Sequence, residues 1–399
     1  MSSLEQYRKS WGVTPTFSGL FGRQPTEEEL LEIVRRYPVA EWLSYLSRIQ
    51  NLLGADRVGD PEHIKAVRYG TLSTDINKRL DEWQRRLPAG NFRLFYERQL
   101  ATIQQIAILH APEAEGPKFE SEAGHDDLGR ALLMTRDLMD ANRRTGTSRE
   151  ELLACMVQDQ IRFSGTPATH YAARALYLYE LGTDNPSDAV QEYLDLFEQA
   201  AGVAARDAIL GGLCVEMLEP TDRLEIAAGW KPVPRAAACP EARQRECLTA
   251  FGKIRRATLQ EVRDSIQRFE EGRPIRDWNL IALSKAPMVD LGSMGMFVVN
   301  RTALGRSLFD GVRHTVTSAA LDGKLPDKFN DLGAVGRVYG DLFELYVQGV
   351  LEAACPGRVL NTTAPHNHGS SGTHDRNRST RMPMFLRVRR VFLVCETRA

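Results

Sequence analysis

Residues 26–53 have the sequence TEEELLEIVRRYPVAEWLSYLSRIQNLL, and their pattern indicates the fold class. Thr26 and Glu29 fit a capping box, in which two side-chain oxygens satisfy free N–H groups at a helix start. Apolar residues then recur at three- and four-residue steps on both sides of Pro38, a residue that ends a helix. Gly54 follows the second run, as glycine commonly does after a helix. The stretch therefore predicts a helical hairpin.

The same spacing continues along much of the chain and predicts further helices over 92–110, 128–143, 149–163, 167–182, 187–201, 203–218 and 303–321. The successive helices show no constant period, which favours an irregular helical fold over a solenoid. The run 296–299 predicts a short buried strand, with a helix as the alternative for so short a run.

One long helix is predicted over about residues 245–271. Its polar face mixes acidic residues with the basic residues Lys253, Arg255, Arg256, Arg263 and Arg268. Charges of both signs on one face are typical of a surface in contact with solvent. We therefore expect these basic side chains to be exposed.

The predicted fold class is mainly α, an irregular multi-helical protein with a small, incomplete α/β unit at the C-terminus. Four prolines in 219–244 mark a change in character. We expect a helical domain over 1–220, a second helical segment over 221–331 and the α/β unit over 332–399.

The amino-acid composition and net charge of the chain limit the classes of function that the sequence supports. The 399 residues are 43% hydrophobic and 26% charged with a formal net charge of -1, so no overall positive field indicates nucleic-acid binding. Six cysteines without a C-x-x-C pair indicate a reducing compartment. The chain lacks an apolar run of the ~18 residues that a membrane helix needs, and its first residues lack a signal-peptide core. We expect a cytoplasmic protein with no membrane partner.

The absence of four sequence motifs disfavours several common catalytic mechanisms. The sequence contains no phosphate loop of the G-x-x-x-x-G-K-[ST] type, no G-x-G-x-x-G turn, no H-E-x-x-H helix and no G-x-S-x-G elbow. Nucleotide-driven and serine-hydrolase chemistries are therefore disfavoured.

The stretch 332–351 predicts a helix with Val335, Val338, Leu342, Leu345, Tyr346 and Gly349 on one face. A short strand is predicted over 358–361 and, after a polar loop, one longer strand or a hairpin over 385–394. An acidic residue, Glu396, follows the second strand. The predicted order is helix, strand, loop, strand, acidic residue.

This order resembles the beginning of a PD-(D/E)xK, restriction-endonuclease-like nuclease core, over about the last seventy residues. The matching positions are Phe343-Glu344 in the helix, Asp375 in the loop and Glu396-x-Arg398, where the family has E-x-K. The resemblance implies that Asp375 and Glu396 hold Mg²⁺, that Glu344 is an accessory carboxylate and that Arg398 takes the lysine position. Arginine stays protonated in proteins, so Arg398 could only stabilise charge there.

The composition changes abruptly over 362–399, which holds seven Arg and no Lys. This change leads to the hypothesis that a frameshift or truncation altered the segment. We expect a nucleic-acid-associated protein with a degenerate or truncated Mg²⁺-dependent nuclease-like domain, a metal-dependent phosphodiesterase impaired in this chain. The alternative is a non-enzymatic helical interaction or scaffold protein with a flexible C-terminal tail, which binds a protein partner through its helical region. A third hypothesis is a metal sensor that uses His366, His368 and His374.

Overall fold

A computed structural model of the chain describes residues 14–53, 61–86, 93–142, 168–180, 186–217, 241–269, 281–299, 301–329 and 331–354. Helices dominate these ranges, and one three-stranded sheet accompanies them, so the predicted mainly α, irregular fold is confirmed. Within the same ranges, no helix combines the length and the apolar character that crossing a membrane requires.

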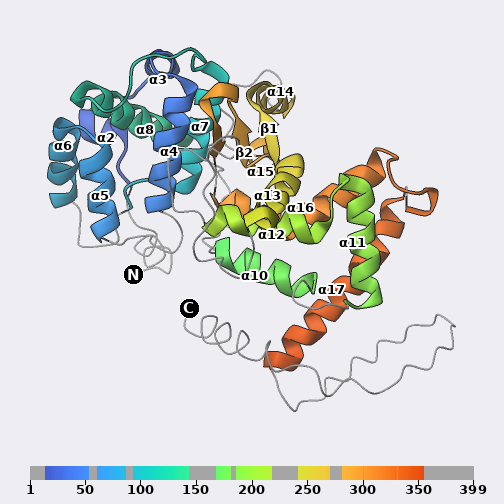
Figure 1. Cartoon of the computed structure of the whole chain (residues 1–399). Helices are drawn as coiled ribbons and strands as arrows, with labels where there is room; N and C mark the ends of the chain where they lie inside the picture. Colours follow the sequence, from blue (N-terminus) through green and yellow to red (C-terminus); the bar gives the residue numbers. More distant parts are fainter. Residues whose placement is uncertain are drawn as a thin grey trace, which may run out of the picture.

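The first hydrophobic core lies among helices near the N-terminus, drawn at the left of Figure 1. These are α2 (Phe17–Phe21), α3 (Glu27–Val34), α4 (Val39–Leu52), α5 (Pro61–Thr71), α6 (Thr74–Arg85), α7 (Glu97–His110) and α8 (Glu122–Asn142). Helix α7 is buried on nearly every side, because α4, α8 and α3 all pack against it. Trp42 and Phe119 are fully buried and meet edge to face, with ring centroids 4.7 Å apart.

The second core lies among helices on the other side of the molecule (Figure 1). These are α10 (Ala168–Leu178), α11 (Asp188–Ala201), α12 (Ala205–Met217), α13 (Glu241–Arg255), α16 (Arg301–Leu321) and α17 (Leu332–Ala354). Helix α16 contacts α10, α11, α12 and α17, so it is the central element of this core. A short 3₁₀ helix, η4 (Asp327–Phe329), leads from α16 towards α17.

A small mixed sheet separates the two cores. It contains β1 (Arg256–Thr258), β2 (Met288–Asp290) and β3 (Met296–Val298), with β1 parallel to β2 and β2 antiparallel to β3. Side chains alternate across a strand, and here they alternate between cores. Val289 and Phe297 belong to the first core, whereas Met288 and Met296 belong to the second. Helices α14 (Leu259–Phe269), α15 (Ile281–Lys285) and η3 (Gly292–Met294) complete this region.

Most predicted elements are confirmed. The capping box is present, since Glu29 N donates to Thr26 Oγ1 and Thr26 N donates to Glu29 Oε2. Helices α3, α4, α7, α8, α10, α11, α12, α16 and α17 overlap the predicted ranges, and β3 is the strand predicted at 296–299. The predicted helix 149–163 and strands 358–361 and 385–394 lie outside the described residues.

The single helix predicted over 245–271 is wrong. Helices α13 and α14 are separate, because residues 256–258 leave the helical path and pair with β2. Thr258 then starts α14: Glu261 N donates to Thr258 Oγ1 at 3.2 Å, and Thr258 N donates to Glu261 Oε2 at 2.8 Å. The prediction that Arg255 is exposed is also wrong, since this side chain lies in the interior.

The predicted division into domains at residues 220 and 331 stays a prediction. The first core combines residues 17–134 with residues 259–299, and the second combines residues 175–251 and 304–342 with one side of the sheet. The chain therefore passes between the two cores more than once.

Candidate interaction site on helix α17

The described residues contain one of the four predicted nuclease residues. Glu344 lies on α17, and its side chain is exposed. Asp375, Glu396 and Arg398 lie outside the described residues, as do His366, His368 and His374. The nuclease-like and metal-sensor sites therefore stay predictions.

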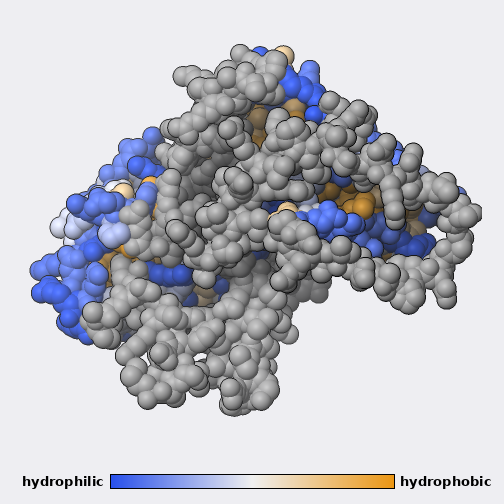
Figure 2. Space-filling view, turned by 90° about the horizontal axis from the view of Figure 1, so that it is seen from below, coloured by the Kyte–Doolittle hydropathy of each residue, from blue (hydrophilic) through white to orange (hydrophobic). Residues whose placement is uncertain are grey.

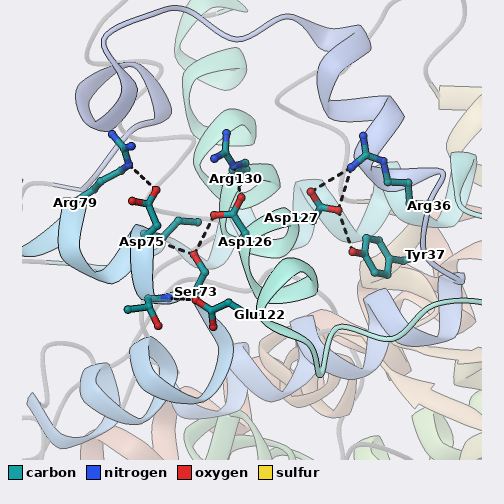
Figure 3. A network of polar contacts seen from close by, with 11 residues as sticks. Arg36, Tyr37, Ser73, Asp75, Arg79, Glu122, Asp126, Asp127 and Arg130 are labelled. Carbon is teal, nitrogen blue, oxygen red and sulfur yellow. Dashed lines mark hydrogen bonds and ion pairs between the residues drawn. The ribbon is translucent and has the colours of Figure 1, made fainter.

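Other carboxylates of the described chain are engaged in a polar network around the start of α8 (Figure 3). Asp126 accepts a hydrogen bond from Ser73 Oγ at 3.0 Å and forms an ion pair with Arg130. Asp127 accepts from Tyr37 Oη at 2.9 Å. These contacts tie α8 to the start of α6 and the end of α3.

The same network continues along α6 (Figure 3). Glu122 accepts from Thr74 N at 2.6 Å, and Asp75 forms an ion pair with Arg79 at 2.7 Å. Each of these carboxylates already has a hydrogen-bond donor, so the network is structural. Among the residues that the structure describes, no group of three His, Cys, Asp or Glu side chains is placed to hold a metal ion.

Helix α17 presents one face to the second core. Val335 and Leu342 are buried there, and the Tyr339 ring lies 5.4 Å from the Tyr193 ring, centroid to centroid. Arg313 of α16 lies over Tyr339, 4.8 Å from the ring centroid, in cation–π geometry. These contacts hold the helix against α11 and α16.

Gly349 extends this contact towards α10. A Cβ at this position would overlap the Tyr177 hydroxyl, so a larger residue would require the Tyr177 side chain to shift. The Tyr177 and Tyr346 rings meet edge to face with centroids 5.6 Å apart. The C-terminal part of α17 extends beyond the body of the second core (Figure 1).

A second stripe of α17 is apolar and exposed, and we call its four residues the docking face: Phe343, Val347, Val350 and Leu351. Their exposed fractions are 41%, 37%, 40% and 38%. Positions i, i+4, i+7 and i+8 lie on one side of a helix, so these side chains form a continuous strip. Leu345, which the sequence placed on the packing face, is instead 39% exposed and lies across the helix from this strip.

One acidic residue, Glu344, borders the docking face. Asp341 and Glu352 are also exposed, but they lie beside Leu345 on the other side of the helix, and residues 341–354 contain no basic residue. Glu344 lies beside Leu351 on the helical surface, since i and i+7 are neighbours two turns apart. In the space-filling view, hydrophobic residues are visible among hydrophilic ones on the right-hand part of the molecule, where α11 lies in Figure 1 (Figure 2).

The sequence contained the signal for this face. Helix α17 is apolar on more than one side, and the spacing of Phe343, Val347, Val350 and Leu351 is as regular as that of the packing face. A helix with two apolar stripes has two surfaces that are stabilised by burial. The packing stripe is covered by the second core, whereas the docking face is exposed. The docking face is therefore the strongest candidate functional surface of the described chain.

A buried cation is the second feature that the sequence did not indicate. The Arg255 side chain at the end of α13 is 4% exposed, and burial lowers its pKa to about 10. Its Nη2 donates one long hydrogen bond, 3.4 Å, to Thr315 Oγ1, and its Nε has no acceptor within the described chain. No described carboxylate forms an ion pair with it, so the charge is poorly compensated.

Comparison with known proteins adds no assignment, since no protein-family model, no characterised protein and no solved structure matches this chain.

Proposed function

We propose that the chain is a helical interaction protein and that α17 binds a partner through the docking face. The observation that supports this proposal is the strip of Phe343, Val347, Val350 and Leu351, which is exposed along two turns of α17 beside its packing face. Exposed apolar side chains are normal when scattered, whereas a contiguous strip marks a contact surface. Recognition along a helix uses this spacing of anchors.

The chemistry of the partner follows from the border of the face. Glu344 borders the apolar strip beside Leu351, and that part of α17, residues 341–354, contains no base. A segment that combines apolar side chains with Arg or Lys would bury its apolar groups on the strip and place a cation beside this acid. Such pairs contribute mainly to selectivity and to the association rate. We expect a basic, amphipathic segment and disfavour an acidic one.

The test uses the full chain and two synthetic peptides of about 16 residues, one of Leu and Arg and one with Glu in place of each Arg. Fluorescence anisotropy of the labelled peptides should show stronger binding of the basic peptide. The substitution Val347→Asp should weaken this binding at least about tenfold, since it buries an unpaired charge in the contact. Leu321→Asp is the matched control, because Leu321 is 68% exposed on α16, outside the docking face. Equal binding of both peptides and no effect of Val347→Asp would contradict the proposal.

The nuclease-like hypothesis is the second candidate. The observation that favours it is that Phe343 and Glu344 lie on helix α17, since the resemblance implies a Phe-Glu pair on a helix. Of the predicted carboxylates, the described residues include only Glu344, so we derive no catalytic step through Mg²⁺. Cleavage of DNA that requires Mg²⁺ and is lost in both Glu396→Ala and Glu344→Gln would support this candidate. Loss of cleavage only in variants that unfold would contradict it.

We place either function in the cytoplasm. The basis is the cysteine pattern, which lacks C-x-x-C pairs, and the burial of the two described cysteines, Cys214 and Cys247. Binding of nucleic acid belongs to the nuclease-like candidate alone.

A further inference from the structure

We propose that Arg255 is the inner part of a binding site for a phosphate-type oxyanion, and that His314 and Lys285 form its outer part. The three side chains come from α13, α16 and α15. The inference goes beyond the proposed function, because none of these residues belongs to the docking face of α17.

The inner part of the site is a buried cation with unused hydrogen-bond donors. Arg255 is 4% exposed, and its Nε has no hydrogen-bond partner within the described chain. Its Nη2 donates a single long hydrogen bond, 3.4 Å, to Thr315 Oγ1. Nε and Nη2 lie on the same edge of the guanidinium, and this planar edge matches the spacing of two phosphate oxygens.

The position of the guanidinium against α16 gives the site a route to the surface. A Cβ at Gly311 would overlap Arg255 Nη2, and Thr315 lies one turn further along the helix. His314 immediately precedes Thr315 and is exposed. The surface of α16 therefore begins next to the hydrogen-bond partner of Arg255.

Two further bases lie near this guanidinium. Helix α15 packs against α16 and ends at the exposed Lys285. Burial lowers the pKa of His314, and the nearby charges of Lys285 and Arg255 lower it further. No described carboxylate affects the pKa of His314 or of Arg255. The local charge is therefore positive, and it favours an anion.

An oxyanion supplies what this group of cations lacks. A buried charge is costly unless an opposite charge and hydrogen bonds compensate it. The negative end of α13 offsets part of the charge of Arg255 but provides no acceptor for Nε. A phosphate group supplies oxygens for Nε and Nη2 on one side and for the two exposed bases on the other. The ligand is a terminal phosphate group, either free or carried by a phosphorylated small molecule.

Thermal denaturation of the full chain with and without inorganic phosphate, at constant ionic strength, tests the site. Phosphate should raise the melting temperature of the wild type, because a ligand that binds only the folded state stabilises it. Arg255→Met should weaken phosphate binding at least about tenfold, the loss expected when hydrogen bonds from a charged group are removed. Arg313→Met is the matched control, since Arg313 is an exposed arginine of α16 that lies over Tyr339 instead.

A second variant moves the guanidinium without changing any charge. In Gly311→Ala the new Cβ would overlap Arg255 Nη2, so the end of this flexible side chain has to shift. The affinity for phosphate should again fall at least about tenfold. Gly336→Ala is its control, because a Cβ there meets no atom within 4 Å.

A phosphomonoester distinguishes the two sources of the ligand. Phenyl phosphate that binds the wild type more tightly than inorganic phosphate, and binds Arg255→Met weakly, supports a phosphorylated small molecule. Tighter binding of inorganic phosphate supports the free ion.

Three outcomes would overturn the inference. They are no response of the wild type to phosphate, an equal response in Arg255→Met, and a loss of the response in Arg313→Met as large as in Arg255→Met. The last result would mean that phosphate responds to the general charge of α16. Each leaves the proposed function of α17 intact, because the peptide-binding test depends on different residues.

Discussion

Two buried arginines show how the two cores differ. In the first, Arg68 donates to Asn77 Oδ1 at 3.1 Å and forms an ion pair with Asp81 at 2.6 Å. In the second, Arg255 has one long hydrogen bond and no described carboxylate partner. Removing a guanidinium from water is costly unless hydrogen bonds and an opposite charge compensate it. The first core meets this requirement at Arg68, and the second does not at Arg255.

The same contrast appears at the surface of each core. Helix α7 of the first core is enclosed by its neighbours, whereas α17 of the second core leaves an apolar stripe exposed. Buried polar atoms without a hydrogen-bond partner occur in both cores of the described chain, for example Gln104 Nε2 in the first and Tyr193 Oη in the second. We infer that the exposed apolar stripe of α17 is what shapes the second core for binding.

The largest expected effect is at the centre of the first core. Trp42 is fully buried, contacts Phe119 and donates its indole N–H to the Val34 carbonyl at 3.1 Å. Trp42→Ala leaves a cavity and an unpaired carbonyl, so it should lower the free energy of unfolding by about 3–5 kcal/mol. Urea denaturation followed by circular dichroism measures this change. A loss below about 1 kcal/mol would mean that Trp42 is not closely packed in the first core.

The next effect concerns the contact between α12 and α13 in the second core. A Cβ at Gly211 would overlap the Cys247 carbonyl and approach Phe251 Cβ to 2.8 Å. Backbone atoms cannot rotate away, so Gly211→Ala should cost about 3 kcal/mol. Gly252→Ala is the matched control: a Cβ there meets no atom within 4 Å, and the substitution should gain about 0.5–1 kcal/mol. If both variants are equally stable, the two helices are less closely packed than described.

Substitution of Arg255 is expected to stabilise the protein, in contrast to Trp42→Ala and Gly211→Ala. Arg255→Met removes a poorly compensated charge and keeps most of the side-chain volume, so it should stabilise the protein by about 2 kcal/mol. The pH dependence follows from the pKa, which burial lowers to about 10 in the folded protein. The folded protein binds this proton less tightly than the unfolded chain, so the charge of Arg255 lowers the stability fully below about pH 10. This destabilisation shrinks as the pH rises above about 10.

Thermal denaturation of the wild type and Arg255→Met at about pH 8 and pH 11 measures both effects. The advantage of the variant should be larger at the lower pH. A destabilised variant would instead mean that Arg255 has an anionic partner outside the described residues. Inorganic phosphate that raises the melting temperature of the wild type alone would identify that partner as a bound anion.

Local sequence patterns predicted the helices because helical spacing and caps are local properties. The capping box of Thr26 and Glu29 and the stripe of α4 illustrate this. The break at 256–258 was missed because β1 exists only through pairing with Met288–Asp290, about thirty residues further along the chain. Thr258 and Glu261 did carry a capping signal, but the apolar spacing through residues 251–269 favoured one continuous helix.

The candidate site was less accessible to sequence reasoning. The spacing on α17 identified its packing face, whereas exposure of the second stripe depends on where neighbouring helices end. The burial of Arg255 likewise depends on α16, whose Gly311 leaves room for the guanidinium. The chemistry predicted at Asp375, Glu396 and Arg398 lies outside the described residues, so it is neither supported nor contradicted.

The smallest effects come from two tyrosine hydroxyls. Tyr37 donates to Asp127 at 2.9 Å, so Tyr37→Phe should cost about 1–2 kcal/mol. Burial and this hydrogen bond raise the pKa of Tyr37 to about 12, so its contribution is complete below about pH 10 and is lost as the pH rises through about 12.

Tyr193 is the counterpart in the second core, where its buried hydroxyl has no hydrogen-bond partner among the described residues. Tyr193→Phe therefore removes an unsatisfied polar group and should leave the stability unchanged or raise it by up to about 1 kcal/mol. Urea denaturation at neutral pH compares the two variants directly. Equal losses in both would contradict the contrast between the cores, because they would require a partner for Tyr193 as effective as Asp127 is for Tyr37. If Tyr37→Phe destabilises the protein and Tyr193→Phe stabilises it, the difference seen between Arg68 and Arg255 also holds for these two tyrosine hydroxyls. Removal of a hydroxyl changes the side-chain volume too little to explain such a difference in another way.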